Sequence, residues 1–237
     1  MNNDMKLYYD YTISPLGQLF YKTLWKQLEG IKDKKILDFG SGFGFTTNFL
    51  AKNNEVVALE IDSSMIEYSK KRNNYIQING DLEEVKKIED ESFDFITCHL
   101  VLEFVENPKE IMNELIRVLK KDGILSVVRH NKNGRIIQAI VKDYDLKDAK
   151  KLLDGGFSYS SAFGDIKYYN NDELLEYTSN KLKVEKVFGI RVLGSIQDGK
   201  IQNNKNWVEE MLEIENKLAQ EEDYIKIAYF NHILLRK

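Results

Sequence analysis

The first segment that suggests a chemical role is residues 36–45, ILDFGSGFGF. An apolar run there ends in Asp38 and is followed by three glycines at alternate positions, Gly40, Gly42 and Gly44. Glycines let the backbone turn sharply and come close to a bulky ligand. The next apolar run ends in Glu60, twenty residues after Gly40, where a carboxylate can accept hydrogen bonds from both hydroxyls of a ribose. We therefore predict a loop that cradles a nucleotide-like ligand.

The spacing of the glycines separates the possible ligands. A dinucleotide fingerprint needs G-x-G-x-x-G, but here the third glycine comes one residue early and Phe45 takes the fingerprint position. A phosphate loop needs Gly-Lys-Ser/Thr after its glycines, and no lysine occurs between Gly40 and Ala51. The pattern therefore disfavours NAD, ATP and GTP.

Alternating strands and helices are predicted to position this loop. Residues 36–39 form a first strand and residues 45–52 the helix after the loop, because their apolar spacing changes from continuous to helical. The further strands are predicted at residues 55–59, 75–78, 93–98 and 123–128. Helices are predicted from residue 62 to about 74, where Met65, Ile66 and Tyr68 form the buried side, and at 108–119.

Polar side chains follow several of these strands, at the ends where an α/β sheet binds its ligands. Asp81 follows the third strand, either as a ligand contact or as the N-cap of the next helix. His99 follows the fourth strand, either as a ligand contact and catalytic candidate or as a packed residue. Glu103 and Glu106, further along, are expected to face solvent or to cap a helix.

The remaining segments lie outside the core alternation. Residues 1–30 are predicted to form an N-terminal flap and helix, with a flap or a frayed end at 1–15 and the helix at 16–28. Residues 131–170 form an insertion with a glycine-rich aromatic stretch at 155–164, either a mobile substrate lid or a structural cap. After a short helix that ends near Ser179, a strand is expected at 182–190 and a final one at 225–235. An amphipathic helix lies between them at 207–218, with its core side chains predicted to be Trp207, Met211, Leu212, Ile214 and Leu218.

The motif D-x-G-x-G-x-G at residues 38–44, with Glu60 downstream, resembles the first motif of the class I methyltransferases that use S-adenosylmethionine (SAM). The resemblance implies a doubly wound, Rossmann-like, mostly parallel sheet of seven strands, with a lid insertion after the fifth strand. SAM carries no phosphate, which suits a loop without lysine. In this family an acidic residue at the Asp81 position accepts from the adenine amine. The cofactor contacts implied are Asp38, Gly40, Ser41, Gly42, Gly44, Glu60, Ile61, Asp81, Leu82 and His99.

The chain also resembles one subfamily, the bacterial tRNA uridine 5-oxyacetic acid carboxyl methyltransferases. The shared pieces are Gly17-Gln18-Leu19, residues 99–105, Asn131 with Gly134, residues 189–192, Tyr224-Ile225 and His232. The resemblance implies a methyl acceptor that is a carboxylate on a tRNA wobble uridine. Phe20 and Tyr229 stand where the subfamily has arginines. The substrate candidates are Arg129, Asn131 and Arg191, with Lys132 nearby; each cation either orients an anionic acceptor or forms a surface salt bridge.

Methyl transfer from SAM, with S-adenosylhomocysteine as the product, is an in-line displacement that depends on alignment. A carboxylate acceptor is already ionised at neutral pH and needs no general base, whereas an amine or hydroxyl acceptor needs a base in reach. Three hypotheses follow: a methyltransferase for tRNA, a methyltransferase for a small metabolite, and a SAM-binding protein without transfer activity.

Composition sets broad limits on partners and location. The 237 residues have a net charge of −4, a single cysteine and no run of eighteen apolar residues. We expect one methyltransferase domain over residues 1–237, in the cytoplasm, with neither an internal disulfide nor a membrane-spanning segment. The three histidines and one thiol have no metal-ligand spacing, so no metal is expected.

Overall fold

The computed structural model describes residues 2–237 of the chain, which divides into two compact units. Unit 1 comprises the chain up to Leu28, Arg129–Tyr168 and Val187–His232, and unit 2 comprises Glu29–Val128, Tyr169–Lys186 and Ile233–Lys237. The candidate cofactor residues all belong to unit 2, whereas the substrate candidates belong to unit 1.

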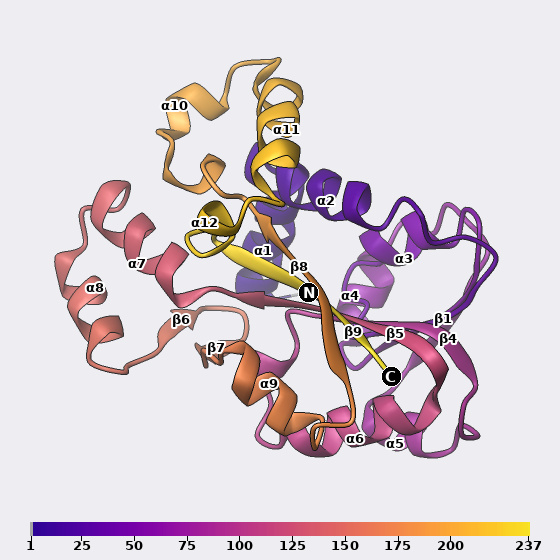
Figure 1. Ribbon diagram of the computed structural model, residues 1–237. Coiled ribbons are helices and arrows are strands. Elements are labelled where there is room, and N and C mark those ends of the chain that lie inside the picture. Colours follow the sequence, from indigo (N-terminus) through magenta and orange to yellow (C-terminus); the bar gives the residue numbers. More distant parts are fainter. Residues whose placement is uncertain (1) are drawn as a thin grey trace. The chain divides into compact units, whose positions relative to one another are not determined.

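Strands and helices alternate along most of the chain (Figure 1). The strands are β1 (Lys35–Phe39), β2 (Glu55–Glu60), β3 (Ile76–Asn79), β4 (Phe93–His99), β5 (Leu119–His130), β6 (Ser158–Ser160), β7 (Gly164–Ile166), β8 (Lys183–Ile190) and β9 (Phe230–Arg236). The α-helices are α1 (Asn3–Ile13), α2 (Pro15–Gln27), α3 (Phe45–Leu50), α4 (Ser63–Tyr68), α5 (Leu82–Lys86), α6 (Pro108–Val118), α7 (Lys132–Val141), α8 (Leu146–Leu153), α9 (Asn171–Tyr177), α10 (Gly199–Gln202), α11 (Trp207–Leu218) and α12 (Glu222–Ile225). Two 3₁₀ turns complete them, η1 (Leu102–Phe104) and η2 (Gly194–Ile196).

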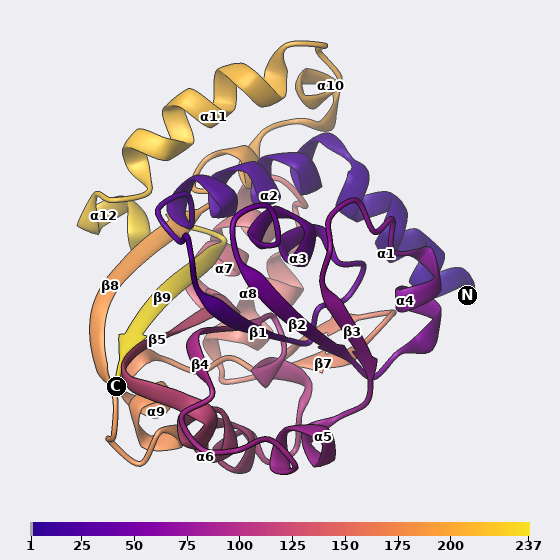
Figure 2. The same cartoon turned by 90° about the vertical axis from the view of Figure 1, so that its right-hand side faces the viewer.

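The main sheet has seven strands in the order β3-β2-β1-β4-β5-β9-β8, which confirms the predicted doubly wound architecture. The pairs β1 with β2, β1 with β4, β2 with β3 and β4 with β5 are all parallel. Figure 2 shows β1, β2 and β3 side by side. The strand order reverses at β1, and its last residue, Phe39, lies opposite Cys98 of β4. Ligands of such sheets bind outside the carboxyl ends of the strands at this reversal, which is where the glycine loop begins.

Some predicted boundaries differ from the structure. Residues 3–13, predicted to be part of a flap or a frayed end, form α1, whose N-cap Asn2 accepts a hydrogen bond from the Met5 backbone N–H. The sequence did not predict this helix because only Met5 and Thr12 are buried in it, so its residues form no apolar stripe. The glycine-rich stretch forms an antiparallel hairpin of β6 and β7. The final strand begins at Phe230 rather than at residue 225, because the preceding residues form α12.

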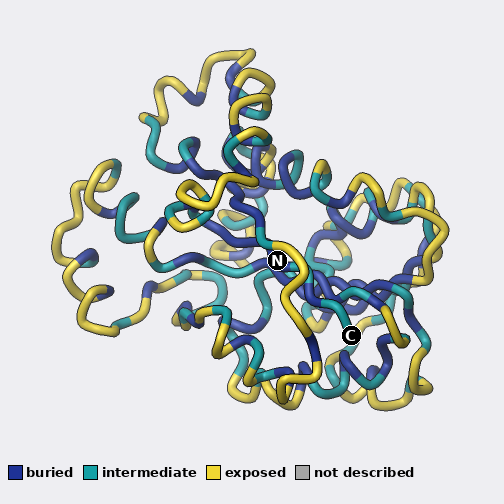
Figure 3. Tube along the Cα trace, in the orientation of Figure 1, coloured by how far each residue is buried: buried dark blue, intermediate teal, exposed yellow. Residues whose placement is uncertain are grey.

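Three predictions of burial were wrong. Glu103 lies in η1 rather than on a helix surface, and its side chain is fully buried. Ile214 is exposed and Glu215 is buried in its place, because the inward face of α11 follows a spacing of four from Trp207 and Met211. Tyr68 is half-exposed because α4 ends at that residue. The colours of Figure 3 show that α11 carries both buried and exposed residues.

Candidate active site

The glycine loop between β1 and α3 has the backbone form that its sequence predicts. Gly40, Gly42 and Gly44 have φ angles of +76°, +55° and +72°, in the left-handed region that favours glycine. A Cβ atom on Gly40 would lie 2.4 Å from Cγ2 of Val101, and one on Gly44 would lie 2.6 Å from Oγ of Ser69. Glycine is therefore required at both positions by conformation and by space.

Asp38 connects three elements beneath this loop. Its Oδ2 accepts a hydrogen bond from the Thr47 hydroxyl of α3 at 2.5 Å, and its Oδ1 accepts one from the Thr97 hydroxyl of β4 at 2.6 Å. Burial raises the pKa of Asp38, and the two hydroxyl donors partly oppose that rise. The carboxylate thus holds the helix after the loop against two central strands.

Glu60, the last residue of β2, fixes the other side of the loop. Its Oε2 accepts a hydrogen bond from the Gly42 N–H at 2.7 Å, and its Oε1 accepts one from the Asp62 N–H at 2.9 Å. Burial raises the pKa of Glu60, while these N–H donors lower it. Each carboxylate oxygen has a further lone pair, so the group can still accept hydrogen bonds from ligand hydroxyls.

The ends of β2 and β3 present a mixed apolar and polar edge. Ile61 is 69% exposed directly after Glu60, and Leu82 is half-buried at the start of α5. Asp81 is exposed and caps α5, since its Oδ1 accepts the Glu83 N–H at 2.9 Å, as the N-cap interpretation predicted. Asn79, which sequence reasoning missed, joins the two strand ends by donating its side-chain amide to the carbonyls of Glu60 and Ile61 at 2.9 and 3.0 Å.

His99 ends β4 beside the same sheet edge. Its Nε2 lies 2.8 Å from the Ser126 hydroxyl of β5, which fixes the orientation of the imidazole. The next residue, Leu100, has a φ of +54° and donates its N–H to the Val128 carbonyl at 2.8 Å. The chain therefore turns away sharply after His99, and the imidazole is only half-buried.

Two of the substrate candidates make hydrogen bonds within unit 1. The Asn131 amide donates to the carbonyls of Ala228 and Lys226 at 2.7 and 3.0 Å, so both of its N–H donors hold the 226–228 turn. Gly134 belongs to the same sequence motif, and only glycine fits there because a Cβ atom would lie 2.2 Å from the Ala228 carbonyl oxygen. Arg129 Nη2 lies 3.4 Å from Oδ1 of Asn231.

Arg191, the third substrate candidate, is a buried cation. Its side chain is 1% exposed, its Nε donates to the Ser195 hydroxyl at 2.9 Å, and its Nη1 donates to the Tyr11 hydroxyl. The guanidinium carbon lies 4.8 and 5.2 Å from the ring centres of Tyr229 and Phe230. Among the described residues no carboxylate pairs with this guanidinium, and its Nη2 is buried without a hydrogen-bond partner. A buried charge of this kind is costly unless a ligand neutralises it.

Glu215 holds the segment that follows Arg191. Its buried carboxylate accepts the backbone N–H groups of Val192, Leu193 and Gly194 at 2.6, 2.9 and 2.8 Å. Sequence reasoning missed this residue, although its spacing of four from Met211 placed it on the inward face of α11. The two positions where the subfamily has arginine are aromatic here: Tyr229 lies against Arg191, and Phe20 packs on Phe230 at 4.9 Å.

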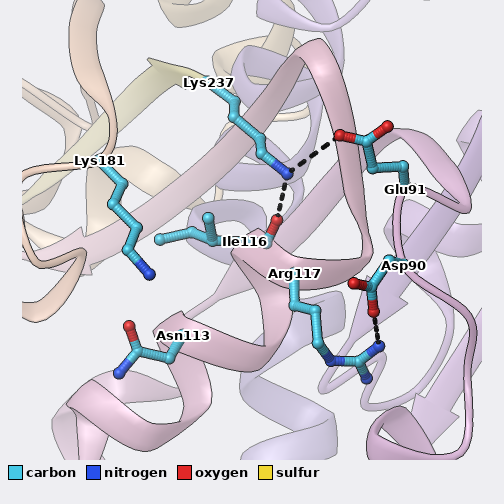
Figure 4. A pocket seen from close by; sticks show the side chains of 7 residues that line it. All are labelled: Asp90, Glu91, Asn113, Ile116, Arg117, Lys181 and Lys237. Carbon is cyan, nitrogen blue, oxygen red and sulfur yellow. Dashed lines mark hydrogen bonds and ion pairs between the residues drawn. The ribbon is translucent and has the colours of Figure 1, made fainter.

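A separate pocket of about 390 Å³ lies in unit 2 (Figure 4). Arg117 is paired there with Asp90, and Lys237 donates to the carbonyls of Ile116 and Leu119. The lining residues precede β4, belong to helix α6 before β5, precede β8 or follow β9, whereas the glycine loop and His99 lie at the carboxyl ends of β1 and β4. This pocket is therefore not part of the candidate active site. Within residues 2–237 no helix is long and apolar enough to span a membrane, and no cluster of three or more potential metal-ligating side chains occurs.

The fold and the loop together define a doubly wound α/β protein with a glycine-rich turn at the strand reversal. Residues 37–127 match the family model of the methyltransferase domain. The chain is 25% identical to a tRNA 5-carboxymethoxyuridine methyltransferase of Escherichia coli, over 93% of this chain and 89% of the relative. It is 29% identical to a ubiquinone biosynthesis O-methyltransferase of Glaesserella parasuis, over 50% of this chain and 55% of the relative.

Solved structures show the same fold. A SAM-dependent methyltransferase of Thermotoga maritima, described as a possible histamine N-methyltransferase, superposes with a TM-score of 0.63 at 17% identity, covering 98% of this chain and 95% of that one. Together these matches show a SAM-dependent methyltransferase with the class I fold, and its cofactor is SAM. The predicted recognition, enzyme class and cofactor are thereby confirmed.

Proposed function

We propose that this methyltransferase transfers its methyl group to a carboxylate oxygen, and that the acceptor carboxylate belongs to a modified wobble uridine of tRNA. The observation that carries the proposal is Arg191, a buried guanidinium with an unused Nη2 and no acidic partner among the described residues. Arginine matches the planar geometry of a carboxylate with two parallel N–H donors. An anionic acceptor would supply the negative charge that no described residue provides to this guanidinium.

The cofactor contacts are part of the same proposal. The loop at Gly40–Gly44 lets bound SAM approach the backbone closely, and Glu60 accepts hydrogen bonds from the ribose hydroxyls. Ile61 and Leu82 offer apolar surface to the adenine ring, and Asp81 accepts from its amine. The structure fits this assignment, since neither lysine nor arginine lies in the loop to hold a phosphate.

SAM, when bound, supplies an electrophilic methyl group on a sulfonium. The work of the chain is then to align the acceptor oxygen with the methyl carbon and to exclude water. His99, fixed by Ser126, is the candidate residue at the transfer step, where it positions the reacting groups. No general base is required, because a carboxylate with a pKa of about 4 is ionised at neutral pH.

The tRNA assignment draws on the Escherichia coli relative, whose match covers nearly the whole chain. The aromatic residues at positions 20 and 229 change how an anion would be held but do not remove the buried arginine. A cytoplasmic location follows from a tRNA substrate and belongs to the same proposal.

The decisive experiment incubates the protein with radiolabelled SAM and cell extract, with and without prior ribonuclease treatment. We expect label in RNA that ribonuclease abolishes and that mild alkali releases, because methyl esters hydrolyse readily. Label confined to a small molecule that resists ribonuclease would refute the tRNA acceptor. Absence of any transfer despite tight S-adenosylhomocysteine binding would refute transfer to either class of acceptor.

The role of Arg191 has its own test. Substituting Arg191→Gln should raise the KM for the acceptor by about 30-fold or more, since truncating a buried hydrogen-bonded charge pair costs 2–5 kcal/mol. The affinity for S-adenosylhomocysteine should stay within about twofold. The matched control is Arg236→Gln, which removes an exposed arginine paired with Glu185. An unchanged acceptor KM in Arg191→Gln would refute the anion site.

A further inference from the structure

The insertion after β5 exposes aromatic and cationic side chains on one continuous stretch of unit 1. Tyr144, between α7 and α8, is 85% exposed, and Tyr159 of β6 is 72% exposed. Lys147, Lys150 and Lys151 of α8 lie between them in the chain, and all three are exposed. Figure 3 shows that the backbone from the end of α7 through α8 is largely exposed. We call these five residues the aromatic–lysine surface.

The exposure of Tyr144 is built into the backbone. Its φ is +54°, in the left-handed region that non-glycine residues seldom adopt and that is rare for bulky side chains. Tertiary structure must hold such a conformation, and residues of this kind gather at functional sites. The structure thus stabilises a strained turn that presents an aromatic ring to solvent.

Helix α8 is oriented so that its cations face outward. Its two buried residues, Ala149 and Leu152, pack inward, and the Gly156 N–H donates to the Lys151 carbonyl at 2.9 Å, which brings the chain leading to β6 back to the helix. Asp145 caps the helix by accepting the N–H groups of Lys147 and Asp148. The lysine side chains are therefore exposed on this helix, as are those of Leu146 and Leu153.

The charge of the insertion is opposite to that of the rest of the chain. Residues 131–170 contain seven basic and five acidic side chains, a net charge of +2, against −4 for the whole chain and therefore −6 for the remainder. Two of those acids, Asp143 and Asp148, are paired with the half-buried Arg135 at 2.5 and 2.6 Å. They do not neutralise the lysines of α8, so the insertion is the part of the chain that attracts a polyanion.

We infer that the aromatic–lysine surface binds an unpaired strand of the acceptor RNA; this inference rests on the proposed tRNA substrate. Every base has a π-face that can stack on an exposed tyrosine, and lysines contact phosphates without reading the base. A surface that combines both groups binds single strands in preference to duplexes, whose bases are already stacked. The insertion thus binds the substrate away from the reacting atoms, as a docking surface and not as a catalytic one.

The same surface is poorly suited to two other occupants. A symmetric dimer through it would place the lysines of one copy against those of another, because a twofold interface is self-complementary. Insertion into a membrane would need a continuous apolar helix face directed outward, but α8 is eight residues long and its exposed leucines, Leu146 and Leu153, are accompanied by three exposed lysines. A single-stranded polyanion fits both the rings and the charges.

The test measures binding of deacylated total tRNA by the full-length chain at several salt concentrations. Lys150→Gln/Lys151→Gln should weaken binding and reduce the slope of log affinity against log salt by roughly 1.4, at about 0.7 per phosphate contact on a single strand. Tyr144→Asn, which suits the left-handed backbone, should weaken binding about tenfold through lost stacking, whereas Tyr144→Phe should retain it. The matched controls are Lys200→Gln/Lys205→Gln and Tyr224→Ala, which alter exposed residues of unit 1 outside the surface.

The outcomes separate the two proposals. If the wild-type chain binds tRNA and the surface variants bind it as tightly as the controls do, the docking surface is refuted and the tRNA substrate stands. If the wild-type chain binds no tRNA at low salt, both proposals fail together. Binding to anionic vesicles, or concentration-dependent dimerisation, that the surface variants abolish while tRNA binding persists would assign the surface to a different partner and overturn the inference. S-adenosylhomocysteine binding within twofold of wild type would show that each variant is folded.

Discussion

Glu215 is the residue whose removal tests most directly how the Arg191 region is held. In Glu215→Ala three buried backbone donors, the N–H groups of Val192, Leu193 and Gly194, lose their acceptor. An unsatisfied buried donor costs about 1–3 kcal/mol, so the loss would approach 3–9 kcal/mol if all three stayed dry. Water entering the space left by the side chain would offset part of it, and we expect a loss of about 4 kcal/mol. That is a large part of the roughly 5–15 kcal/mol that stabilises a typical domain.

Glu215→Gln should cost less but still measurably. Its amide oxygen can replace Oε1, which accepts from Leu193 and Gly194, but its NH₂ group would face the N–H of Val192. Two donors then oppose each other, at about 1–3 kcal/mol. The matched control is Glu213→Ala on the same helix, where an exposed carboxylate pairs with Lys217 in a salt bridge that solvent screens, so its loss should change stability little.

The assay is urea unfolding followed by far-UV circular dichroism, with the acceptor KM measured for variants that fold. We expect the midpoints to fall in the order Glu213→Ala, Glu215→Gln, Glu215→Ala, and the acceptor KM of Glu215→Gln to rise while S-adenosylhomocysteine affinity does not change. If Glu215→Ala were as stable as Glu213→Ala, the three hydrogen bonds would not hold this segment, and the reasoning would be wrong.

Further predictions concern the cofactor site. Gly40→Ala should abolish detectable S-adenosylhomocysteine binding in calorimetry, because the new Cβ atom would lie 2.4 Å from Cγ2 of Val101. The control is Gly155→Ala, at a position with a φ of +89° and no atom close to the new Cβ. This variant has the backbone strain without the clash, so it should bind S-adenosylhomocysteine normally. Glu60→Gln should weaken S-adenosylhomocysteine binding about 10- to 100-fold, because it removes a charged acceptor for the ribose hydroxyls. The control Glu67→Gln, on the exposed surface, should not change the affinity. Equal affinities of the Glu60→Gln and Glu67→Gln variants would exclude the ribose role of Glu60. Burial raises the pKa of Asp38, so its contribution to stability is complete below the unfolded pKa of about 4 and is lost as pH rises through the folded value. The stability of wild type relative to Asp38→Asn should therefore increase from pH 7 to pH 5 in urea unfolding, and a difference that stays flat or falls would contradict the shift.

The sequence was sufficient to predict those elements whose signals lie in residues close together in the chain. The glycines of the loop, the carboxylate ending β2 and the position of α11 were all predicted, because alternate glycines, a strand end and a 3.6-residue period are local signals. The strands of the main sheet were predicted from their apolar runs, and their doubly wound arrangement was implied by the family resemblance. These features depend on residues close together in the chain.

Features that depend on distant partners were missed. Glu103 is buried, and no local pattern distinguishes it from the solvent-facing Glu106 three residues later. The role of Asn79 depends on the carbonyl groups at the end of β2, eighteen and nineteen residues earlier. Helix α1 has no apolar stripe of its own, so its formation could not be deduced from its period.

Arg191 and Glu215 show why the function of a buried charge cannot be derived from sequence. An arginine and a glutamate in the same protein can form an ion pair, but here the Glu215 carboxylate accepts hydrogen bonds from the backbone N–H groups that follow Arg191. The Arg191 guanidinium is left with hydroxyls and aromatic rings, which orient it without neutralising it. Had the two side chains paired, the arginine would be a structural residue and an anionic acceptor would have to displace a carboxylate. Because the carboxylate instead fixes the backbone, the arginine keeps a charge without an acidic partner among the described residues, and this is the charge that our proposal assigns to an anionic acceptor.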